Sequence, residues 1–194
     1  MTKIPKIHFV YSYVYDNTLT NLIKQKYRPN TRKFALSYIE RLTKAFDKIS
    51  DKSLAEMSKL SGLKWQKDYI EVYVVKYAPY SFSIPLTLKM YKDINKSVAV
   101  LVHELAHNLV SQNKARIRYR ELFQDYKRYD TDAKFHLIEG SILVLLNKKL
   151  FGSKSKGFFK YDNWYGKGMP HSYAKVMDVV SKENKEIIKE YIKP

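Results

Sequence analysis

The chain of 194 residues contains no cysteine. Disulfide bonds, thiolate zinc sites, iron–sulfur clusters and a cysteine nucleophile are therefore excluded, and any metal ion must be bound by nitrogen and oxygen atoms. No run of about 18 uncharged apolar residues occurs, so we expect no membrane span. The first residues also lack the continuous apolar stretch and the cleavage site of a secretory signal. These absences predict a soluble, cytoplasmic protein.

Acidic residues are scarce, with 19 Asp and Glu against 36 Lys and Arg, which gives a formal charge of +17. Such an excess favours contact with an anionic partner, such as nucleic acid or an acidic protein. The lysines are nevertheless spread along the whole chain and form no basic tail. A generally lysine-rich surface explains the charge equally well, so the charge alone identifies no partner.

Glycine and proline are also few, at six each, whereas apolar residues make up 45% of the chain. This length and composition predict a single domain, residues 1–194, with a substantial core. The patterns indicate an α+β fold, in which a small antiparallel or mixed sheet has an edge strand beside a buried helix and the C-terminal half is mostly helical. We expect strands at 6–14, 68–77 and 81–91, helices at 17–27, 31–50, 53–60, 97–110, 115–128, 132–150 and 171–191, and a long loop at 152–170.

The sequence His103-Glu104-Leu105-Ala106-His107 lies inside the predicted helix 97–110. Residues four apart share one face of a helix, so both imidazoles can bind one metal ion while Glu104 accepts a proton from water. A catalytic zinc site needs three such ligands and an open position. The structural alternative is a pair of core histidines with a partnered glutamate.

The segment VLVHELAHNL around this motif resembles the metal-binding helix of the zincin metallopeptidases. The resemblance implies a Zn²⁺-dependent peptidase with Glu104 as general base and a polypeptide substrate. In zincins the substrate runs along an edge strand beside the active-site helix, and the expected strand 81–91 immediately precedes the helix here. Pro85 inside that strand agrees with a position at the sheet edge.

A third metal ligand must come from elsewhere in the chain. The sequence NLVSQNKARIR after the motif lacks the glycine and histidine of metzincins. A gluzincin-like site would take a later glutamate, for which Glu139 is the preferred candidate because it lies among apolar residues. His136, three residues earlier and on nearly the same face, is the competing ligand or a group that orients Glu139. Leu143 stands where gluzincins carry an aspartate, so the subclass stays open.

The glycine-rich loop 152–170 and the residues just after it offer further candidates. His171 is a candidate catalytic group that stabilises the oxyanion, and Tyr165 and Tyr173 are candidate substrate-binding residues. Two other functions stay open. One is a protease that acts on DNA-associated or regulatory proteins. The other is a metal-stabilised, non-catalytic basic protein that binds nucleic acid or an acidic partner.

Overall fold

A computed structural model describes residues 3–152, 156–160 and 171–193, with the side chains of residues 160 and 171–174 left undescribed. In chain order the elements are β1 (Lys6–Val10), α1 (Tyr13–Leu19), η1 (Thr20–Ile23), α2 (Thr31–Phe46), α3 (Ser50–Ser61), β2 (Tyr69–Val75), β3 (Phe82–Ser83), β4 (Leu86–Lys89), α4 (Ile94–Gln112), η2 (Lys114–Arg116), α5 (Tyr119–Asp125), α6 (Thr131–Phe151), η3 (Gly157–Lys160) and α7 (His171–Tyr191).

The four strands form one mixed sheet in the order β1-β2-β4-β3. β1 pairs with β2 and β2 pairs with β4, both in parallel, whereas β3 pairs with β4 in antiparallel fashion. The buried positions of β2, namely Ile70, Val72 and Val74, alternate with more exposed ones. One face of β2 therefore contributes to the core, as the period of two along a strand requires.

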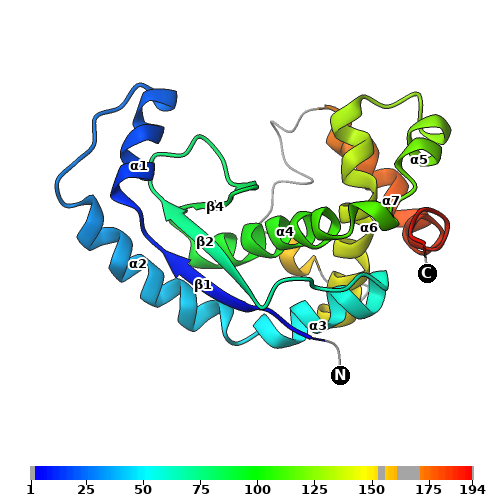
Figure 1. Cartoon of the computed structure of the whole chain (residues 1–194), viewed down its shortest axis with the longest axis horizontal. Coiled ribbons are helices and arrows are strands. Elements are labelled where there is room, and N and C mark those ends of the chain that lie inside the picture. Colours follow the sequence, from blue (N-terminus) through cyan, green and yellow to red (C-terminus); the bar gives the residue numbers. More distant parts are fainter. Residues whose placement is uncertain (1–2, 153–155, 161–170, 194) are drawn as a thin grey trace.

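Helix α4 lies in the middle of the molecule. Figure 1 shows the sheet with α1 and α2 on one side of α4, and α5, α6 and α7 on the other. The carboxylate of Asp93 caps the start of α4 by accepting a hydrogen bond from the backbone N–H of Asn95, at 2.9 Å. Most α4 residues are buried, including Leu101, Leu105 and Leu109. Packing on both sides holds this helix in place.

Helix α6 begins after a second aspartate cap, in which Asp130 accepts from the backbone N–H of Ala133 at 2.8 Å. It packs against α3, α4 and α7. Its residues from His136 to Val144 are buried in an unbroken run, which is possible because neighbouring helices cover several of its sides. A polar side chain on such a buried helix is shielded from water, so where it points toward α4 it needs a polar partner on that helix.

The predicted α+β class is confirmed, including the mixed sheet, the buried motif helix and the mostly helical C-terminal half. Two expected strands were wrong in their extent. The strand expected at 6–14 ends at Val10, and α1 begins at Tyr13 within the same segment. The segment 81–91 forms two short strands, because the chain reverses at Ile84 and Pro85. Of these two strands, β3 lies at an edge of the sheet and β4 lies inside it. Similarly, the expected helix 115–128 is shorter, since η2 precedes α5.

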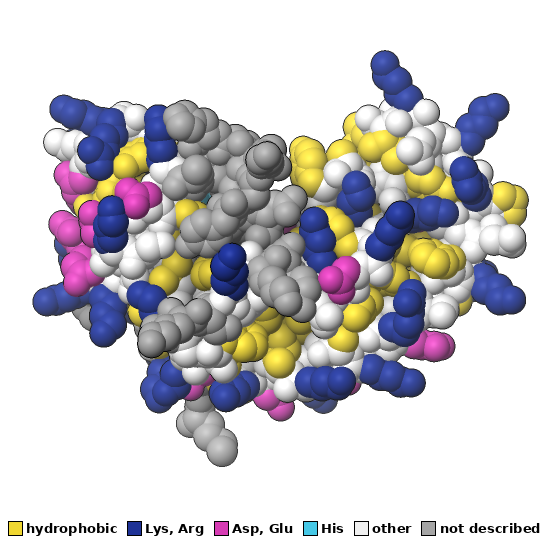
Figure 2. Space-filling model, turned by 180° about the vertical axis from the view of Figure 1, so that it is seen from behind, with side chains coloured by type: hydrophobic (Ala, Val, Ile, Leu, Met, Phe, Trp, Pro, Cys, Tyr) yellow, Lys and Arg dark blue, Asp and Glu magenta, His cyan; other side chains and the backbone are white. Residues whose placement is uncertain are grey.

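Lys and Arg side chains are scattered over the face of the molecule that Figure 2 displays, and no single basic patch dominates it. Acidic side chains are fewer on this face and lie among the basic ones. Within the described residues, no helix combines the length and the apolar character that a membrane crossing needs.

Candidate metal centre

Helix α4 carries all three polar residues of the motif. His103 and His107 are half-buried and Glu104 is buried, at 8% exposure. The two Nε2 atoms of the histidines lie 3.0 Å apart, and the ring centroids are separated by 4.9 Å. The spacing of four residues has therefore placed both imidazoles on one face of the helix, as the sequence predicted.

Helix α6 adds a third imidazole to this face. The ring centroid of His136 is 4.7 Å from that of His107 and 6.1 Å from that of His103. One ligand atom from each of the three histidines lies within 4.8 Å of the others. Two helices, separated in sequence by η2 and α5, thus bring three nitrogen donors together.

A backbone hydrogen bond defines the tautomer of His136. Its Nδ1 atom lies 2.7 Å from the carbonyl oxygen of Asp132, one turn earlier in α6. A carbonyl oxygen can only accept, so Nδ1 carries the proton and Nε2 carries the lone pair. Metal-binding histidines commonly donate their other ring nitrogen to a carbonyl or carboxylate in this way. His136 is therefore prepared to bind a metal through Nε2.

Glu139 lies behind His107 and is not one of the converging donors. Its Oε1 atom is 3.3 Å from Nδ1 of His107, and both side chains are largely buried. Its Oε2 atom is also buried, with no hydrogen-bond partner among the described residues. A carboxylate on Nδ1 directs the Nε2 atom of the same ring toward a metal. The structure thus places His136 with the two α4 histidines, and Glu139 one step further away.

The charges of the cluster act in opposite directions on two of its imidazoles. Burial lowers the pKa of His107, but the negative charge and hydrogen bond of Glu139 outweigh burial, so the pKa is raised. Burial and the neighbouring charge of His107 lower the pKa of His136 to about 4. His136 is therefore neutral at physiological pH, which is the form of histidine that binds metals.

The donor set is compatible with zinc. Three imidazoles are the protein ligands of some catalytic zinc sites. The Nε2 atoms of His103 and His107 lie 3.0 Å apart, close enough to bind one ion together. With no thiolate in the chain, the alternative soft metals are disfavoured.

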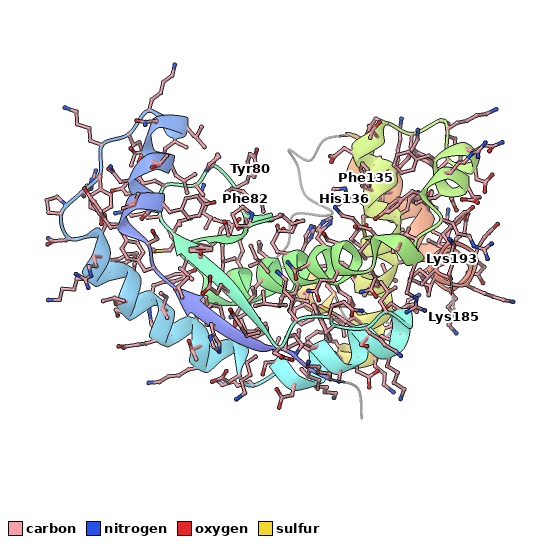
Figure 3. The ribbon with its side chains drawn as sticks, viewed as in Figure 1. Tyr80, Phe82, Phe135, His136, Lys185 and Lys193 are labelled. Atoms are coloured by element: carbon pink, nitrogen blue, oxygen red, sulfur yellow. The ribbon has the colours of Figure 1, made fainter. Side chains whose placement is uncertain are left out.

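Exposed aromatic side chains lie on both sides of α4. In Figure 3, Tyr80 and Phe82 lie toward the sheet, and Phe135 lies next to His136 on α6. Tyr80 is 66% exposed and packs edge-to-face on Phe82, with centroids 5.8 Å apart. Phe135 is 41% exposed, and its ring centroid lies 5.0 Å from that of Phe123. Exposed aromatic groups beside a polar cluster are typical of binding sites.

Sequence reasoning had not selected Tyr80, Phe82 or Phe135. The sequence carried no signal for Phe135, because apolar residues occur on nearly every side of the helix expected at 132–150. The candidates His171 and Tyr173 lie in the first turn of α7, but their side chains are outside the described residues. Tyr165 is also outside the described residues.

Comparison of the chain with family models, with curated proteins and with solved structures gave no match. The interpretation of the site therefore depends on its own residues and geometry.

Proposed function

We propose that the protein is a zinc-dependent peptidase. The observation that supports this function is the convergence of His103, His107 and His136 within 4.8 Å, with the buried Glu104 in the same turn of α4. A carboxylate in the same helical turn as two converging imidazoles is a candidate general base. We assign this role to Glu104.

Each residue of the cluster has a distinct role in this proposal. The three histidines hold the ion, His136 in the tautomer set by the Asp132 carbonyl and His107 in the orientation set by Glu139. When bound, zinc would lower the pKa of a water molecule to roughly 7 and so supply a nucleophile at neutral pH. Glu104 would accept the proton of the attacking water and pass it to the leaving amine.

The surroundings of the site favour an extended polypeptide as substrate. β3 is an edge strand of the sheet and packs against the helix that carries His103 and His107. Among the described residues no strand pairs with its outer side, so we propose that a substrate backbone adds there. Tyr80 and Phe82 on one side and Phe135 on the other offer apolar surface for substrate side chains. We therefore expect cleavage next to large apolar residues.

The test combines metal content with activity. The purified protein should contain near-stoichiometric zinc by elemental analysis and should degrade unfolded casein. Glu104→Gln should keep the zinc and lose hydrolysis, by a factor of at least about 100 for loss of a general base. Glu40→Gln, on an exposed position of α2, is the matched control and should change neither quantity. A wild type that binds no zinc when supplied with it contradicts the proposal.

The basic surface supports a second candidate function. The formal charge of +17 and the scattered Lys and Arg side chains favour an anionic partner, either a nucleic acid or an acidic protein. In that case the metal would stabilise the fold, or the peptidase would act on DNA-associated proteins. Binding to double-stranded DNA that weakens steeply with salt would support a nucleic-acid partner, while casein hydrolysis without DNA binding would exclude that partner.

A further inference from the structure

The edge strand β3 is short and is held by few contacts. It consists of Phe82 and Ser83, both half-buried, and within the described residues it pairs with β4 alone. β4 is fixed more firmly, since Leu86, Thr87 and Leu88 are buried in the sheet. A two-stranded ribbon with so few residue pairs is marginally stable by itself. The position of β3 relative to the histidine cluster therefore depends on contacts other than strand pairing.

The side chain of Asn108 supplies such a contact. Asn108 directly follows His107 on α4, and its Nδ2 atom donates to the carbonyl oxygen of Ser83 at 3.3 Å. Ser83 is the last residue of β3, and β3 packs against α4. One hydrogen bond thus joins the neighbour of a candidate metal ligand to the strand beside the site.

The orientation of the Asn108 amide is set by the backbone before β2. Gln112, one turn later on α4, accepts through Oε1 from the backbone N–H groups of Gln66 and Lys67, at 2.7 and 3.3 Å. A backbone N–H can only donate, so the amide nitrogen of Gln112 faces the other way and donates to Oδ1 of Asn108 at 2.6 Å. The oxygen of Asn108 is thereby engaged, and its nitrogen faces Ser83.

This row of amides places β3 and the metal-binding residues in one rigid arrangement. α4 carries His103 and His107, and the same helix is tied to the segment before β2 at one end of the row and to β3 at the other. For a polypeptide paired with β3, the distance between β3 and α4 decides where its scissile bond lies. A displacement of about 1 Å from the reactive geometry can cost about 100-fold in rate.

We propose that Asn108 is a positioning residue that holds β3 in place beside the metal centre, and that the site in consequence acts on extended polypeptide segments and not on dipeptides. The inference rests on the peptidase proposal. An extended segment gains backbone hydrogen bonds to β3, and this remote binding energy orients the bond to be cleaved. A dipeptide that spans only the scissile bond gains none of it. Asn108 touches no reacting atom and acts through β3.

The first experiment compares two substrates on two variants. Asn108→Leu has a side chain of similar size without a donor. Asn95→Leu, at an exposed position near the start of α4, makes the same change away from the row and is the matched control. The substrates are an unstructured peptide of about ten residues and a blocked dipeptide that contains the same scissile bond.

The wild type should prefer the long peptide by at least about tenfold in kcat/KM, because the long peptide alone pairs with β3. Asn108→Leu should lower kcat/KM for the long peptide about tenfold, mainly through KM, and leave the dipeptide within about twofold. Asn95→Leu should match the wild type on both substrates. The zinc content of all three proteins should be equal, because no metal ligand has changed.

A second measurement needs no catalysis. In the metal-free protein, the backbone amides of β3 and β4 should exchange with deuterium at least about fivefold faster in Asn108→Leu than in Asn95→Leu, because β3 has lost its tie to α4. The amides in the middle of α4 should exchange equally fast in both variants, which also shows that both are folded.

The outcomes separate this inference from the peptidase proposal. If the wild type cleaves neither substrate, the peptidase proposal fails and this inference fails with it. If the wild type is active but Asn108→Leu loses zinc, weakens both substrates equally, or matches Asn95→Leu in kinetics or in exchange, then only the positioning role of Asn108 is overturned. A wild type that cleaves the dipeptide as efficiently as the long peptide overturns the substrate class.

Discussion

Replacement of the third imidazole is the most informative perturbation of the metal centre. If His136 binds the metal and Glu139 only orients His107, then His136→Ala should reduce zinc affinity much more than Glu139→Gln. In the wild type, Oε1 of Glu139 lies 3.3 Å from Nδ1 of His107. In Glu139→Gln the side-chain oxygen can still accept the hydrogen bond from this nitrogen. The His107 ring then keeps its orientation.

The expected loss of zinc affinity is about tenfold larger for His136→Ala than for Glu139→Gln. Structural zinc sites with four ligands contribute about 10–16 kcal/mol, so the loss of one ligand costs about 3 kcal/mol, or roughly 100-fold in affinity. Loss of an outer hydrogen-bond partner costs 10–100-fold, and a variant that retains an acceptor should lie at about tenfold or less. Asp132→Asn should have no effect, because the backbone carbonyl of Asp132, not its 66% exposed side chain, accepts from His136.

The assay is competition for zinc with a chromophoric chelator, performed on all three variants and the wild type. Circular dichroism of the metal-free proteins controls for folding. If Glu139→Gln removes zinc binding while His136→Ala retains it, Glu139 is a direct ligand and the assignment derived from the geometry is refuted.

Four other predictions follow from particular contacts. Asp16 is fully buried, and one of its carboxylate oxygens accepts hydrogen bonds from the backbone N–H groups of Lys76 and Tyr77, directly after β2. Asp16→Ala should therefore lower the free energy of unfolding by about 1–3 kcal/mol in chemical denaturation, and Asp16→Asn should lower it less. Burial raises the pKa of Asp16 above 3.8, so the native state binds this proton more tightly than the unfolded state does. The wild type should therefore lose stability relative to Asp16→Asn as the pH rises above 3.8. A stability difference that does not change with pH would refute the burial argument. Leu109→Ala should leave a cavity in α4 and cost about 2–5 kcal/mol of unfolding free energy, and a cost below 1 kcal/mol would mean that α4 is not central. In the peptidase assay, Phe135→Ala should raise KM about tenfold for substrates with large apolar residues and leave kcat nearly unchanged, since it removes binding surface but no reacting group.

Within the described part of the chain, no strand pairs with Tyr69–Val72 on the side of β2 away from β1, and this can be measured directly. The amides of Tyr69 and Glu71 face away from β1, whereas those of Ile70 and Val72 face it. In the free protein we expect the first pair to exchange with deuterium at least about tenfold faster than the second. Equal protection of all four amides, measured by NMR, would show that another segment covers the edge.

The sequence by itself determined most of the helices and the shared face of His103 and His107 in the candidate metal centre. The apolar residues around the motif require a buried helix, and the spacing of His103 and His107 places both rings on one face whatever surrounds the helix. Such relations span one helical turn, so they need no knowledge of the rest of the fold. The α+β class followed in the same way from the local periodicities of two and of three to four residues.

Only the tertiary structure decided which residue completes the cluster. His136 and Glu139 lie on nearly the same face of α6, so the sequence allowed either to reach α4. The crossing of α6 over α4 places His136 beside both rings and Glu139 behind His107. That crossing depends on packing against α3, α4 and α7, which involves residues distant in sequence.

The pairing of the strands could not be predicted from the sequence either. The sequence of Tyr69–Val72 does not indicate that β4 pairs only with the later residues of β2, since strand pairing joins residues far apart along the chain. Pro85 did indicate an interruption, but the sequence could not show that the chain reverses there to form β3. Local patterns therefore determined which segments are helices and strands, and long-range packing determined which side chains meet.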